Sequence, residues 1–305
     1  MIVDRTDKNH VDPFRPYAYF IEAERTHDGI VEDVATLFLT NRECPFQCVF
    51  CDLWKNTTDE RVPVGAIPQQ IDFALERLSP APHIKLYNSG NFFDRQAIPP
   101  EDYGAIAARL KKFKTVIVEN HPKLCDDEVL RFRDLVGTQL EVAIGLETAD
   151  DAILSRLNKG MTLDDFGRAA RFCTDNGVRV RAFVLLQPPF GDIGNDAVRS
   201  ALDSIRFAFD TGVSCCCVIP TRAGANAFDQ PDLSGHFQPP SFAALEEVAL
   251  AGIEMRRGRV FVDVWDAERF CDCDRCAGLR VERLRQMNLT QKITSPVVCS
   301  CGMSV

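Results

Sequence analysis

The feature that most constrains this fold is a repeated alternation of short apolar runs with segments of helical period. The apolar runs occupy residues 34–40, 84–90, 115–120, 140–148, 178–187 and 213–220. Segments with the apolar spacing of amphipathic helices follow them, at residues 67–78, 100–113, 125–136, 150–158, 162–177, 196–212 and 241–256. Repeated strand–helix units predict a parallel sheet, and right-handed crossovers curl such a sheet into a full or partial barrel. We therefore expect an α/β fold, a partial (β/α)6 barrel of the TIM type, with functional residues at the carboxyl ends of its strands.

The cysteines are the second informative feature. The chain has 13 of them, and most gather at residues 44–51, 215–217 and 271–301. The polar N-terminus lacks the apolar stretch of a signal peptide, and no apolar run reaches the roughly 18 residues of a membrane span, so we expect a soluble, cytoplasmic protein with no membrane partner. Disulfides are rare in that compartment, and clustered thiols there indicate metal binding or redox chemistry. The consecutive cysteines at 215–217 lie on a predicted strand, where burial in the sheet is the simpler interpretation.

The first cysteine cluster stands directly after the first predicted strand. In the stretch "ECPFQCVFCDLW", Cys44, Cys48 and Cys51 follow the spacing C-x3-C-x2-C. Structural zinc usually takes four protein ligands, so a zinc site here needs a distant fourth residue. A [4Fe–4S] cluster is also usually held by four thiolates, and with three of them one iron is left open to another molecule. The triad by itself leaves both interpretations standing.

A resemblance favours the cluster. A Cys-x3-Cys-x-aromatic-Cys loop after the first strand of a βα barrel resembles that of the radical S-adenosylmethionine (SAM) enzymes. The resemblance implies a [4Fe–4S] cluster whose open iron chelates the amino and carboxylate groups of SAM. The reduced cluster passes an electron to the sulfonium, the C5′–S bond breaks, and the 5′-deoxyadenosyl radical abstracts a hydrogen atom from the substrate. It further implies a reductant such as flavodoxin or ferredoxin, and it places Phe50 where the ring shields the cluster and lies near the adenine.

Residues at the following strand ends are candidate cofactor contacts. They are Ser89, Gly90, Asn91, Glu119, Glu147 and Arg181. The resemblance places the backbone of residues 89–91 against the methionine amino group of SAM, Glu119 against the same group, and Glu147 near the ribose. Arg181 alternates with apolar neighbours on the fifth predicted strand, and we expect it to pair with a carboxylate or phosphate.

Longer stretches narrow the resemblance. "VENHP", "IGLETADDAILSRLNKGMT", "FVLLQPPF" and "VIPTRAGANAF" resemble the group containing the Elongator catalytic subunit and, more closely, the radical SAM subunit of archaeosine synthase, over roughly residues 35–225. Both relatives act on tRNA, so a tRNA base is one candidate substrate and tRNA a candidate partner. A small molecule or a peptide is the alternative. The chain is acidic, with a net charge of −9, and it therefore needs a local basic surface to hold RNA.

The end of the chain differs in character from the rest. We expect residues 1–33 to form an N-terminal extension, residues 34–257 the core barrel, and residues 258–305 a cysteine-rich appendage. The appendage carries Cys271, Cys273, Cys276, Cys299 and Cys301. Two close groups of thiols on either side of a predicted helix indicate a metal site, either zinc or an auxiliary iron–sulfur cluster. A metal-stabilised RNA-binding protein without catalysis is therefore the alternative to an enzyme.

Overall fold

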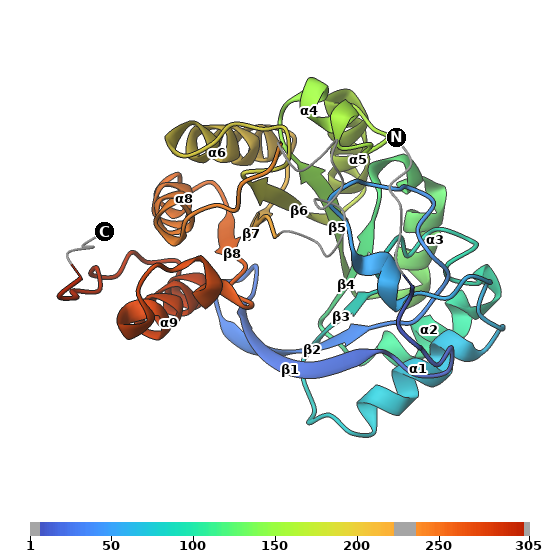
Figure 1. Cartoon of the computed structure of the whole chain (residues 1–305). Coiled ribbons are helices and arrows are strands. Elements are labelled where there is room, and N and C mark those ends of the chain that lie inside the picture. Colours follow the sequence, from blue (N-terminus) through green and yellow to red (C-terminus); the bar gives the residue numbers. More distant parts are fainter. Residues whose placement is uncertain (1–6, 223–235, 302–305) are drawn as a thin grey trace.

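The chain folds around one curled sheet (Figure 1). The computed structural model describes residues 7–222 and 236–301. Within them, eight strands follow one another across the sheet in sequence order. The first strand pairs antiparallel with the second, and every later pair is parallel. The carboxyl ends of the parallel strands therefore share one rim of the sheet.

The predicted strands and helices are present, with their ends shifted by a few residues. The strands are β1 (Ala18–Arg25), β2 (Val31–Phe38), β3 (His83–Tyr87), β4 (Thr115–Asn120), β5 (Gln139–Glu147), β6 (Arg179–Leu186), β7 (Cys215–Pro220) and β8 (Arg259–Val262). The helices are α1 (Ala66–Leu75), α2 (Tyr103–Leu110), α3 (Asp127–Val136), α4 (Asp151–Arg156), α5 (Leu163–Asp175), α6 (Asn195–Asp210), α8 (Phe242–Glu254) and α9 (Asp274–Thr290). Short 3-10 helices are η1 (Leu53–Asn56), η2 (Pro100–Asp102), η3 (Pro122–Leu124) and η4 (Ala267–Phe270).

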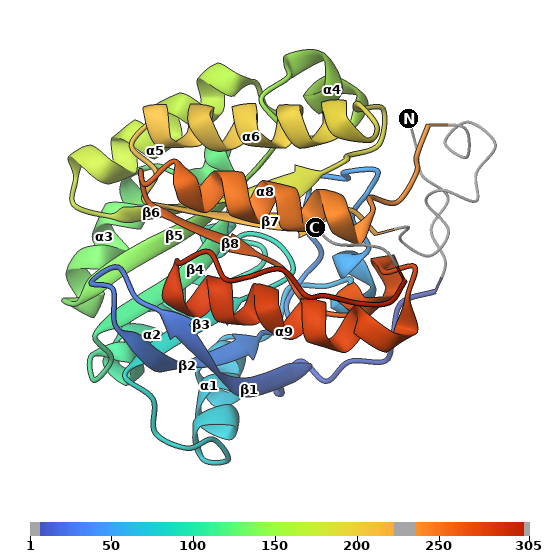
Figure 2. The ribbon, with the colours of Figure 1, turned by 90° about the vertical axis from the view of Figure 1, so that its left-hand side faces the viewer.

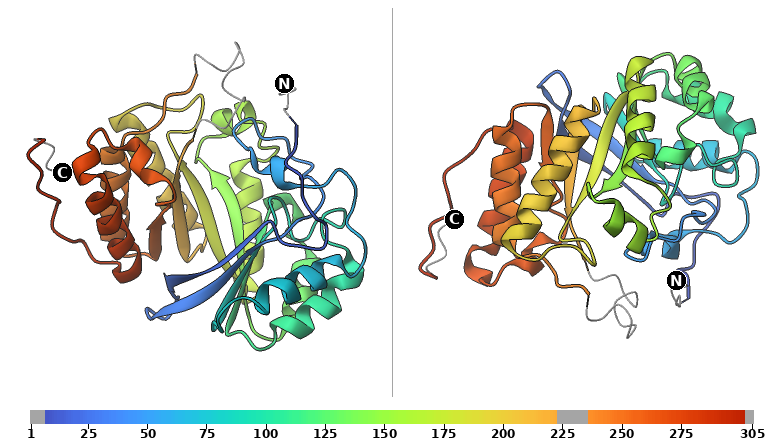
Figure 3. Two further views of the ribbon diagram at one scale, coloured as in Figure 1. Left: turned by 60° about the horizontal axis from the view of Figure 1, so that its bottom comes forward. Right: turned by 90° about the horizontal axis from the view of Figure 1, so that it is seen from above.

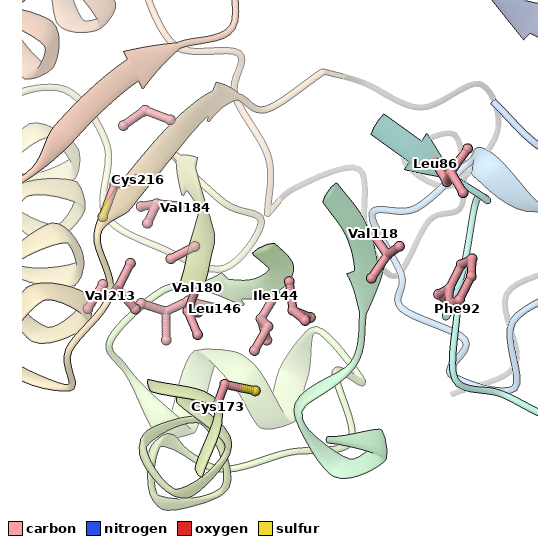
Figure 4. Packing of buried hydrophobic residues seen from close by; sticks show 14 of the residues in the cluster. Leu86, Phe92, Val118, Ile144, Leu146, Cys173, Val180, Val184, Val213 and Cys216 are labelled. Atoms are coloured by element: carbon pink, nitrogen blue, oxygen red, sulfur yellow. The ribbon is translucent and has the colours of Figure 1, made fainter. Parts of the chain in front are cut away.

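Strand side chains alternate between the two faces of the sheet. Those on the outer face are apolar, and the helices pack against them. Along β6, Val180 and Val184 point outward into the core that the sheet shares with its helices (Figure 4). Ile144 of β5 and Cys173 of α5 belong to the same core and are fully buried. Cys216, the middle of the three consecutive cysteines, is also fully buried there. Two of the 13 cysteines, Cys173 and Cys216, are therefore explained as buried core side chains.

The inner face carries charged side chains toward the amino ends of the strands. Arg181 of β6 pairs with Glu24 of β1 (2.6 Å) and with Glu141 of β5 (2.7 Å). Lys85 pairs with Glu24 (2.6 Å), and Arg259 pairs with Glu141 (3.0 Å). Burial acts to raise the pKa of Glu24, but Arg181 and Lys85 hold that pKa well below its usual range. We call these five residues, three cations and two carboxylates, the barrel ion network. They fill the inner face of the sheet near the amino ends of the parallel strands with paired charges.

Both ends of the chain contribute to the sheet. β1 comes from the predicted N-terminal extension, and β8 comes from the predicted appendage. Helix α9 packs against both edge strands, in the opening between them (Figures 2 and 3). The prediction of an α/β partial barrel with a cysteine-rich C-terminal part is confirmed, with one strand added at each edge, while the domain boundaries at 33 and 257 stay predictions. Among the described residues, no helix is both long enough and apolar enough to cross a membrane.

Candidate functional site

The cysteine loop leaves the sheet at the carboxyl end of β2. At its root, the Leu39 N–H donates to the Tyr87 carbonyl of β3 (2.7 Å). The side chain of Gln70 in α1 accepts from the Thr40 N–H (2.8 Å) and donates to the Thr40 carbonyl (2.7 Å). Gln70 is buried. Because these bonds satisfy the backbone just past the strand, the loop starts from a fixed position.

The three thiols of the loop lie close enough to influence one another. The Cys51 N–H donates to the Cys48 carbonyl (3.2 Å). Burial raises the pKa of Cys48 to about 11. Burial, with the neighbouring sulfurs of Cys48 and Cys44 adding to it, raises the pKa of Cys51 to about 12. The loop alone therefore holds neutral thiols, and a metal or cluster that binds them displaces protons.

The turn after β3 packs against the first cysteine. Asn91 donates from Nδ2 to the Cys44 sulfur (3.2 Å). A Cβ added to Gly90 would lie 3.4 Å from the Cys44 Cβ, which is ordinary van der Waals contact, so this turn lies directly against the cysteine. Ser89 has a left-handed φ of 52°, and its hydroxyl shares a hydrogen bond with the Tyr17 hydroxyl (2.7 Å). The predicted 89–91 stretch is thus held directly beside the cysteine loop.

Glu119, at the end of β4, binds the same turn through its backbone. Its Oε1 accepts the N–H of Asn88 and the N–H of Gly90 (3.2 Å). Burial raises the pKa of Glu119 to about 7, although these donors and Lys159 oppose the shift. The Asn88 side chain donates to Asn41 (2.7 Å), while its buried Oδ1 has no hydrogen-bond partner among the described atoms. An unpartnered buried acceptor is costly, so a ligand group that carries N–H donors and positive charge fits this position.

A buried ion pair stands at the end of β5. Lys159 Nζ lies 2.6 Å from Glu147 Oε1, and both side chains are at least nine-tenths buried. Glu147 has a left-handed φ of 67° and closes an irregularity in the pairing of β5 with β6. A Cβ added to Gly145 would lie 2.3 Å from Glu147 Oε1 and 2.5 Å from Lys159 Nζ, so only glycine leaves room for this pair. The Lys159 charge also opposes the upward pKa shifts of Cys44 and Cys48. A buried cation therefore faces the cysteine loop.

Lys159 is the residue that sequence reasoning missed. It lies in the stretch "IGLETADDAILSRLNKGMT", between α4 and α5. A lysine followed by a glycine between two helical segments gives no signal of its own. Its burial depends on how one loop packs against another, which local spacing does not encode.

The α4–α5 connection supports the cysteine loop from outside. The Val49 N–H donates to the Leu157 carbonyl (3.0 Å), and Asn158 Nδ2 donates to the Gln47 carbonyl (2.8 Å). Val49 and Leu157 form a small apolar cluster, and Phe50 packs against it. The ring of Phe50 therefore lies on an apolar patch of the loop, and its shielding of a cluster stays a prediction.

An aromatic stack joins the cysteine loop to the end of β4. Phe46 lies parallel to His121, with ring centroids 3.6 Å apart and planes 11° apart. His121 Nδ1 accepts from the Lys123 N–H (3.2 Å), so its Nε2 is the donor to the Lys159 carbonyl (3.0 Å). Burial and the Lys159 charge lower the pKa of His121 to about 3. The imidazole is therefore neutral and positions the loop.

Arg181 does not join this site, in contrast to the sequence expectation. It lies near the amino end of β6, where Glu24 and Glu141 neutralise its guanidinium. The cysteine loop lies at the opposite end of the strands. The alternation correctly placed Arg181 on the inner face, but it could not say which carboxylates would meet it there. The structure replaces the expected cofactor contact with a place in the barrel ion network.

Four of the five tail cysteines converge on one point. Their sulfurs all lie within 4.8 Å of one another, and the four are Cys273, Cys276, Cys299 and Cys301. Cys273 precedes the first turn of α9, where backbone N–H groups lower its pKa to about 6. Cys271 stays outside the set, since its sulfur accepts from Arg280 (3.6 Å) and it packs on the main core. The described residues thus hold two separate thiol groups, one at the strand ends and one beside α9.

The structure brings most of the predicted site together. The loop cysteines, the 89–91 stretch, Glu119 and Glu147 share the rim, whereas Arg181 does not. The quoted stretch "VIPTRAGANAF" continues past residue 222, where it lies outside the described residues.

Comparisons with known proteins find similar sequences and a similar fold. The sequence is 22% identical to an uncharacterised protein of Methanocaldococcus jannaschii, over 95% of this chain and 86% of that protein. It is 26% identical to archaeosine synthase subunit beta of Methanosarcina acetivorans, over 66% of this chain and 60% of that protein. The structure is similar to that of the archaeal Elp3 of Methanocaldococcus infernus, with a TM-score of 0.55 and 14% identity, over 84% of this chain and 63% of that one. At this identity the structural similarity concerns the fold alone.

The match to a protein family covers the candidate site just described. Residues 39–203, more than half of the chain, match the radical SAM superfamily. The matched range contains the three loop cysteines, the turn after β3, Glu119 and the Glu147–Lys159 pair. The chain therefore belongs to the radical SAM superfamily of enzymes.

Proposed function

We propose that this enzyme holds a [4Fe–4S] cluster on Cys44, Cys48 and Cys51, cleaves SAM there, and modifies a tRNA base. The observation that carries the proposal is the convergence, on one rim, of three thiols, the turn bound by Glu119 and a buried lysine. When bound, the cluster would supply the electron that splits SAM into methionine and a 5′-deoxyadenosyl radical.

The residues around the loop suit three thiolate ligands. Deprotonated sulfurs concentrate negative charge, and Lys159 is the buried cation that faces them. Asn91 adds an N–H donor to the Cys44 sulfur. Hydrogen bonds and charges around ligand sulfurs tune such centres, so both residues stabilise the deprotonated form of the loop.

The turn after β3 and the ends of β4 and β5 would hold SAM. Its amino group is a cation with N–H donors, which matches the Glu119 carboxylate and the open acceptor at Asn88 Oδ1. Lys159 donates a hydrogen bond to Oε1 of Glu147. A contact of Glu147 with the ribose hydroxyls would therefore use Oε2. These assignments rest on the site geometry together with family membership.

The choice of a tRNA base rests on a relative. Archaeosine synthase subunit beta is the named protein with which this chain shares 26% identity, and the chain spans about three fifths of its length. A small molecule or a peptide is the rival substrate. We also propose a flavodoxin or ferredoxin as electron donor. Family membership favours an enzyme over a metal-stabilised RNA-binding protein.

Anaerobic reconstitution with iron and sulfide tests the radical chemistry. We expect about four irons per chain at the loop and formation of 5′-deoxyadenosine from SAM and a strong reductant. Cys48→Ala should lose both. Cys125→Ala is the matched control, because this half-buried cysteine belongs to neither thiol group. A Cys48→Ala protein that still produced 5′-deoxyadenosine would contradict the proposal.

The substrate is tested separately. The reconstituted enzyme is incubated with tRNA, SAM and reductant, and the tRNA nucleosides are analysed by mass spectrometry. A new nucleoside that appears only with active enzyme supports the tRNA assignment. If the enzyme makes 5′-deoxyadenosine but leaves the tRNA unchanged, the tRNA assignment is contradicted. The proposed cleavage of SAM is then unaffected.

We further propose that the four converging tail cysteines hold one zinc ion. A tetrahedral ion with metal–sulfur bonds of about 2.3 Å places its sulfurs about 3.8 Å apart. The sulfurs of Cys276 and Cys301 lie 4.0 Å apart, and all four lie within 4.8 Å. A cluster of several irons stands between its ligands and holds their sulfurs farther apart, so the spacing favours a single ion.

Metal analysis of purified protein decides this point. We expect one zinc per chain in the wild type, its loss in Cys273→Ala, and its retention in Cys271→Ala, whose sulfur lies outside the set. Cys48→Ala should keep the zinc while it loses the loop iron. Loss of iron rather than zinc in Cys273→Ala would instead establish an auxiliary cluster.

A further inference from the structure

A cavity lies at the amino ends of the strands, at the other end of the sheet from the cysteine loop. Its volume is about 460 Å³. Its walls come from the end of β1 and the following turn, from Ser214 before β7, from the α8–β8 connection, and from Gln291 after α9. These segments are distant in sequence and meet where α9 closes the gap between the edge strands. The cavity is therefore a product of the complete fold.

Every charged side chain that lines this cavity is basic. The basic residues are Arg25, His27, Arg256, Arg257 and Arg259. No carboxylate is among the described residues that line the cavity, although the chain as a whole has a net charge of −9. Like charges repel at this distance unless an opposite charge comes between them. This concentration of positive charge on an acidic protein would be stabilised by a bound anion.

Part of that charge is unmatched in the described structure. Arg257 pairs with Asp210 (2.7 Å), and Arg259 pairs with Glu141 (3.0 Å). Arg25 donates to the Leu289 carbonyl (3.3 Å) and forms no ion pair with a described residue. The side chain of Arg256 makes neither a hydrogen bond nor an ion pair with a described residue, and its backbone N–H donates to the Ile253 carbonyl (3.2 Å). Two guanidinium groups therefore remain available to an anion.

Two further observations agree with an anion site. The Nε atom of Arg259 is buried and has no hydrogen-bond partner among the described atoms. Burial, Arg179 and Arg259 lower the pKa of His27, against the weaker opposing effects of Asp28 and Glu141. Arg259, which lines the cavity, thus keeps one unused buried donor, and Arg179 and Arg259 make the electrostatic potential at His27 positive.

We propose that this cavity binds a phosphate group. Guanidinium groups bind oxyanions through paired N–H donors, and the cavity is lined both by Arg25 at the end of β1 and by Arg256 in the α8–β8 connection. Thr26 Oγ1 accepts from the Ile30 N–H (3.3 Å), which leaves its own proton for a ligand oxygen. Among the described lining residues, Ile253 is the large apolar side chain, and none is Phe, Tyr or Trp. The lining is therefore dominated by cationic N–H donors, which suit a phosphate group.

The phosphate belongs either to an RNA backbone or to a small phosphorylated molecule. β6 has eight residues, and at about 3.3 Å per residue the cavity lies roughly 26 Å from the rim. An RNA whose base reaches the cysteine loop would have to extend along the whole depth of the barrel to reach this cavity. A small phosphorylated ligand would bind without any contact to the rim.

Isothermal titration of the full chain with inorganic phosphate, and then with pyrophosphate, tests the site. Arg25→Ala/Arg256→Ala should weaken binding at least about tenfold, since each charged hydrogen bond contributes at least that much. The matched control is Arg199→Ala/Arg206→Ala, which removes two exposed arginines of α6 that pair with aspartates one turn away. The control should bind within about twofold of wild type. Equal binding by wild type and the Arg25/Arg256 variant, or no binding by wild type, overturns the proposal.

Two measurements guard against a folding defect. Arg25→Lys/Arg256→Lys keeps the charges and loses the paired donors, so its affinity should fall between the other two. The His27 imidazole, followed by NMR, should titrate at a higher pH when phosphate is bound, and this shift should vanish in the alanine variant. A shift that persists in the alanine variant would mean that phosphate binds elsewhere.

The affinity for tRNA, measured at several salt concentrations, distinguishes an RNA phosphate from the phosphate of a small molecule. If the cavity holds an RNA phosphate, the alanine variant should lower the salt slope by about one. If tRNA binding is unchanged while phosphate binding is lost, the ligand is a small phosphorylated molecule. Absence of any tRNA binding counts against the proposed tRNA substrate, and the phosphate titration still decides the cavity on its own.

Discussion

Two buried ionisable side chains, Glu119 and Lys159, determine the electrostatics beside the cysteine loop. Burial favours the neutral form of Glu119, while the Glu147 carboxylate keeps Lys159 charged. Lys159 in turn opposes the upward shift at Glu119. A change at either residue therefore alters both the binding of a cationic ligand and the charge that faces the sulfurs.

SAM affinity should rise with pH through neutrality. The pKa of Glu119 is raised to about 7, and its carboxylate form is the one that attracts the SAM amino group. Equilibrium dialysis of reconstituted enzyme between about pH 6 and about pH 8 should show tighter binding at the higher pH, by up to about tenfold per pH unit below the pKa. Glu119→Gln should bind weakly and without this pH dependence. A wild-type profile as flat as that of the variant would remove Glu119 from the SAM site.

The same residue affects stability with a definite sign. Because its pKa is raised in the folded state, Glu119 retains a proton that the unfolded chain releases between the ordinary carboxyl pKa and about pH 7. Its contribution to the free energy of unfolding therefore falls as pH rises through that window. Chemical denaturation should show that this decline is smaller in Glu119→Gln.

Lys159→Met should act on both the fold and the cluster. It leaves the Glu147 carboxylate buried without its partner, which we expect to cost about 3–5 kcal/mol. Adding Glu147→Gln should recover much of that loss. In reconstituted protein the loss of a nearby positive charge should make the cluster harder to reduce, so its midpoint potential should become more negative. An unchanged potential in the reconstituted Lys159→Met variant, which keeps the Glu147 carboxylate, would show that Lys159 only supports the structure.

At the scale of elements, the strand ends carry the unusual backbone. Ser89 after β3, Glu147 at the end of β5 and Gln187 after β6 all have left-handed φ values, of 52°, 67° and 57°. Non-glycine residues rarely adopt this conformation, and where they do it often accompanies a functional site. These positions lie at the carboxyl ends of three parallel strands, the rim to which we assign SAM binding.

Gly145→Ala should disturb the rim through β5. The added methyl group would overlap the Glu147–Lys159 pair, and overpacking of this kind costs about 1–3 kcal/mol. We expect lower SAM affinity and a lower melting temperature. Gly104→Ala in α2 is the matched control, because nothing lies within 4 Å of the added atom, and it should be neutral or slightly stabilising. Equal effects of the two substitutions would contradict the role given to Gly145.

At the scale of the whole molecule, the barrel ion network joins strands that are remote in sequence. Arg181 and Glu24 are 157 residues apart, and Arg259 and Glu141 are 118 residues apart. The network lies below the rim, while α9 covers the gap between the edge strands. The partial barrel is therefore completed by elements near both ends of the chain: β1 forms one edge of the sheet, β8 the other, and α9 packs against both.

Arg181→Met should destabilise the whole fold. Removal of Arg181 takes a buried, hydrogen-bonded partner from both Glu24 and Glu141, which keep only Lys85 and Arg259. We expect a loss of about 3–5 kcal/mol at neutral pH by urea denaturation. Arg199→Met, on the exposed face of α6, should change stability by less than about 0.5 kcal/mol. Because the pKa values of Glu24 and Glu141 are depressed in the folded state, their stabilising contribution is present above the ordinary carboxyl pKa and lost in acid. The stability gap between wild type and Arg181→Met should therefore narrow as pH falls below about 4.

The sequence by itself determined the order of strands and helices, the spacing of the three loop thiols, and the rim on which the candidate residues stand. These features depend on the backbone period and on residues a few positions apart, and both can be read along the chain. Glu119 and Glu147 could be placed for the same reason, since each ends a predicted strand.

Only the tertiary structure decided which charges meet. It paired Lys159 with Glu147, removed Arg181 from the site, excluded Cys271 from the tail thiols, and gathered arginines from β1 and from the α8–β8 connection into one cavity. The physical reason is that burial and ion pairing depend on segments that are distant in sequence and adjacent only in the folded chain. A strand pattern predicts the face of the sheet to which a side chain points. The residue that it contacts on that face depends on how the elements pack.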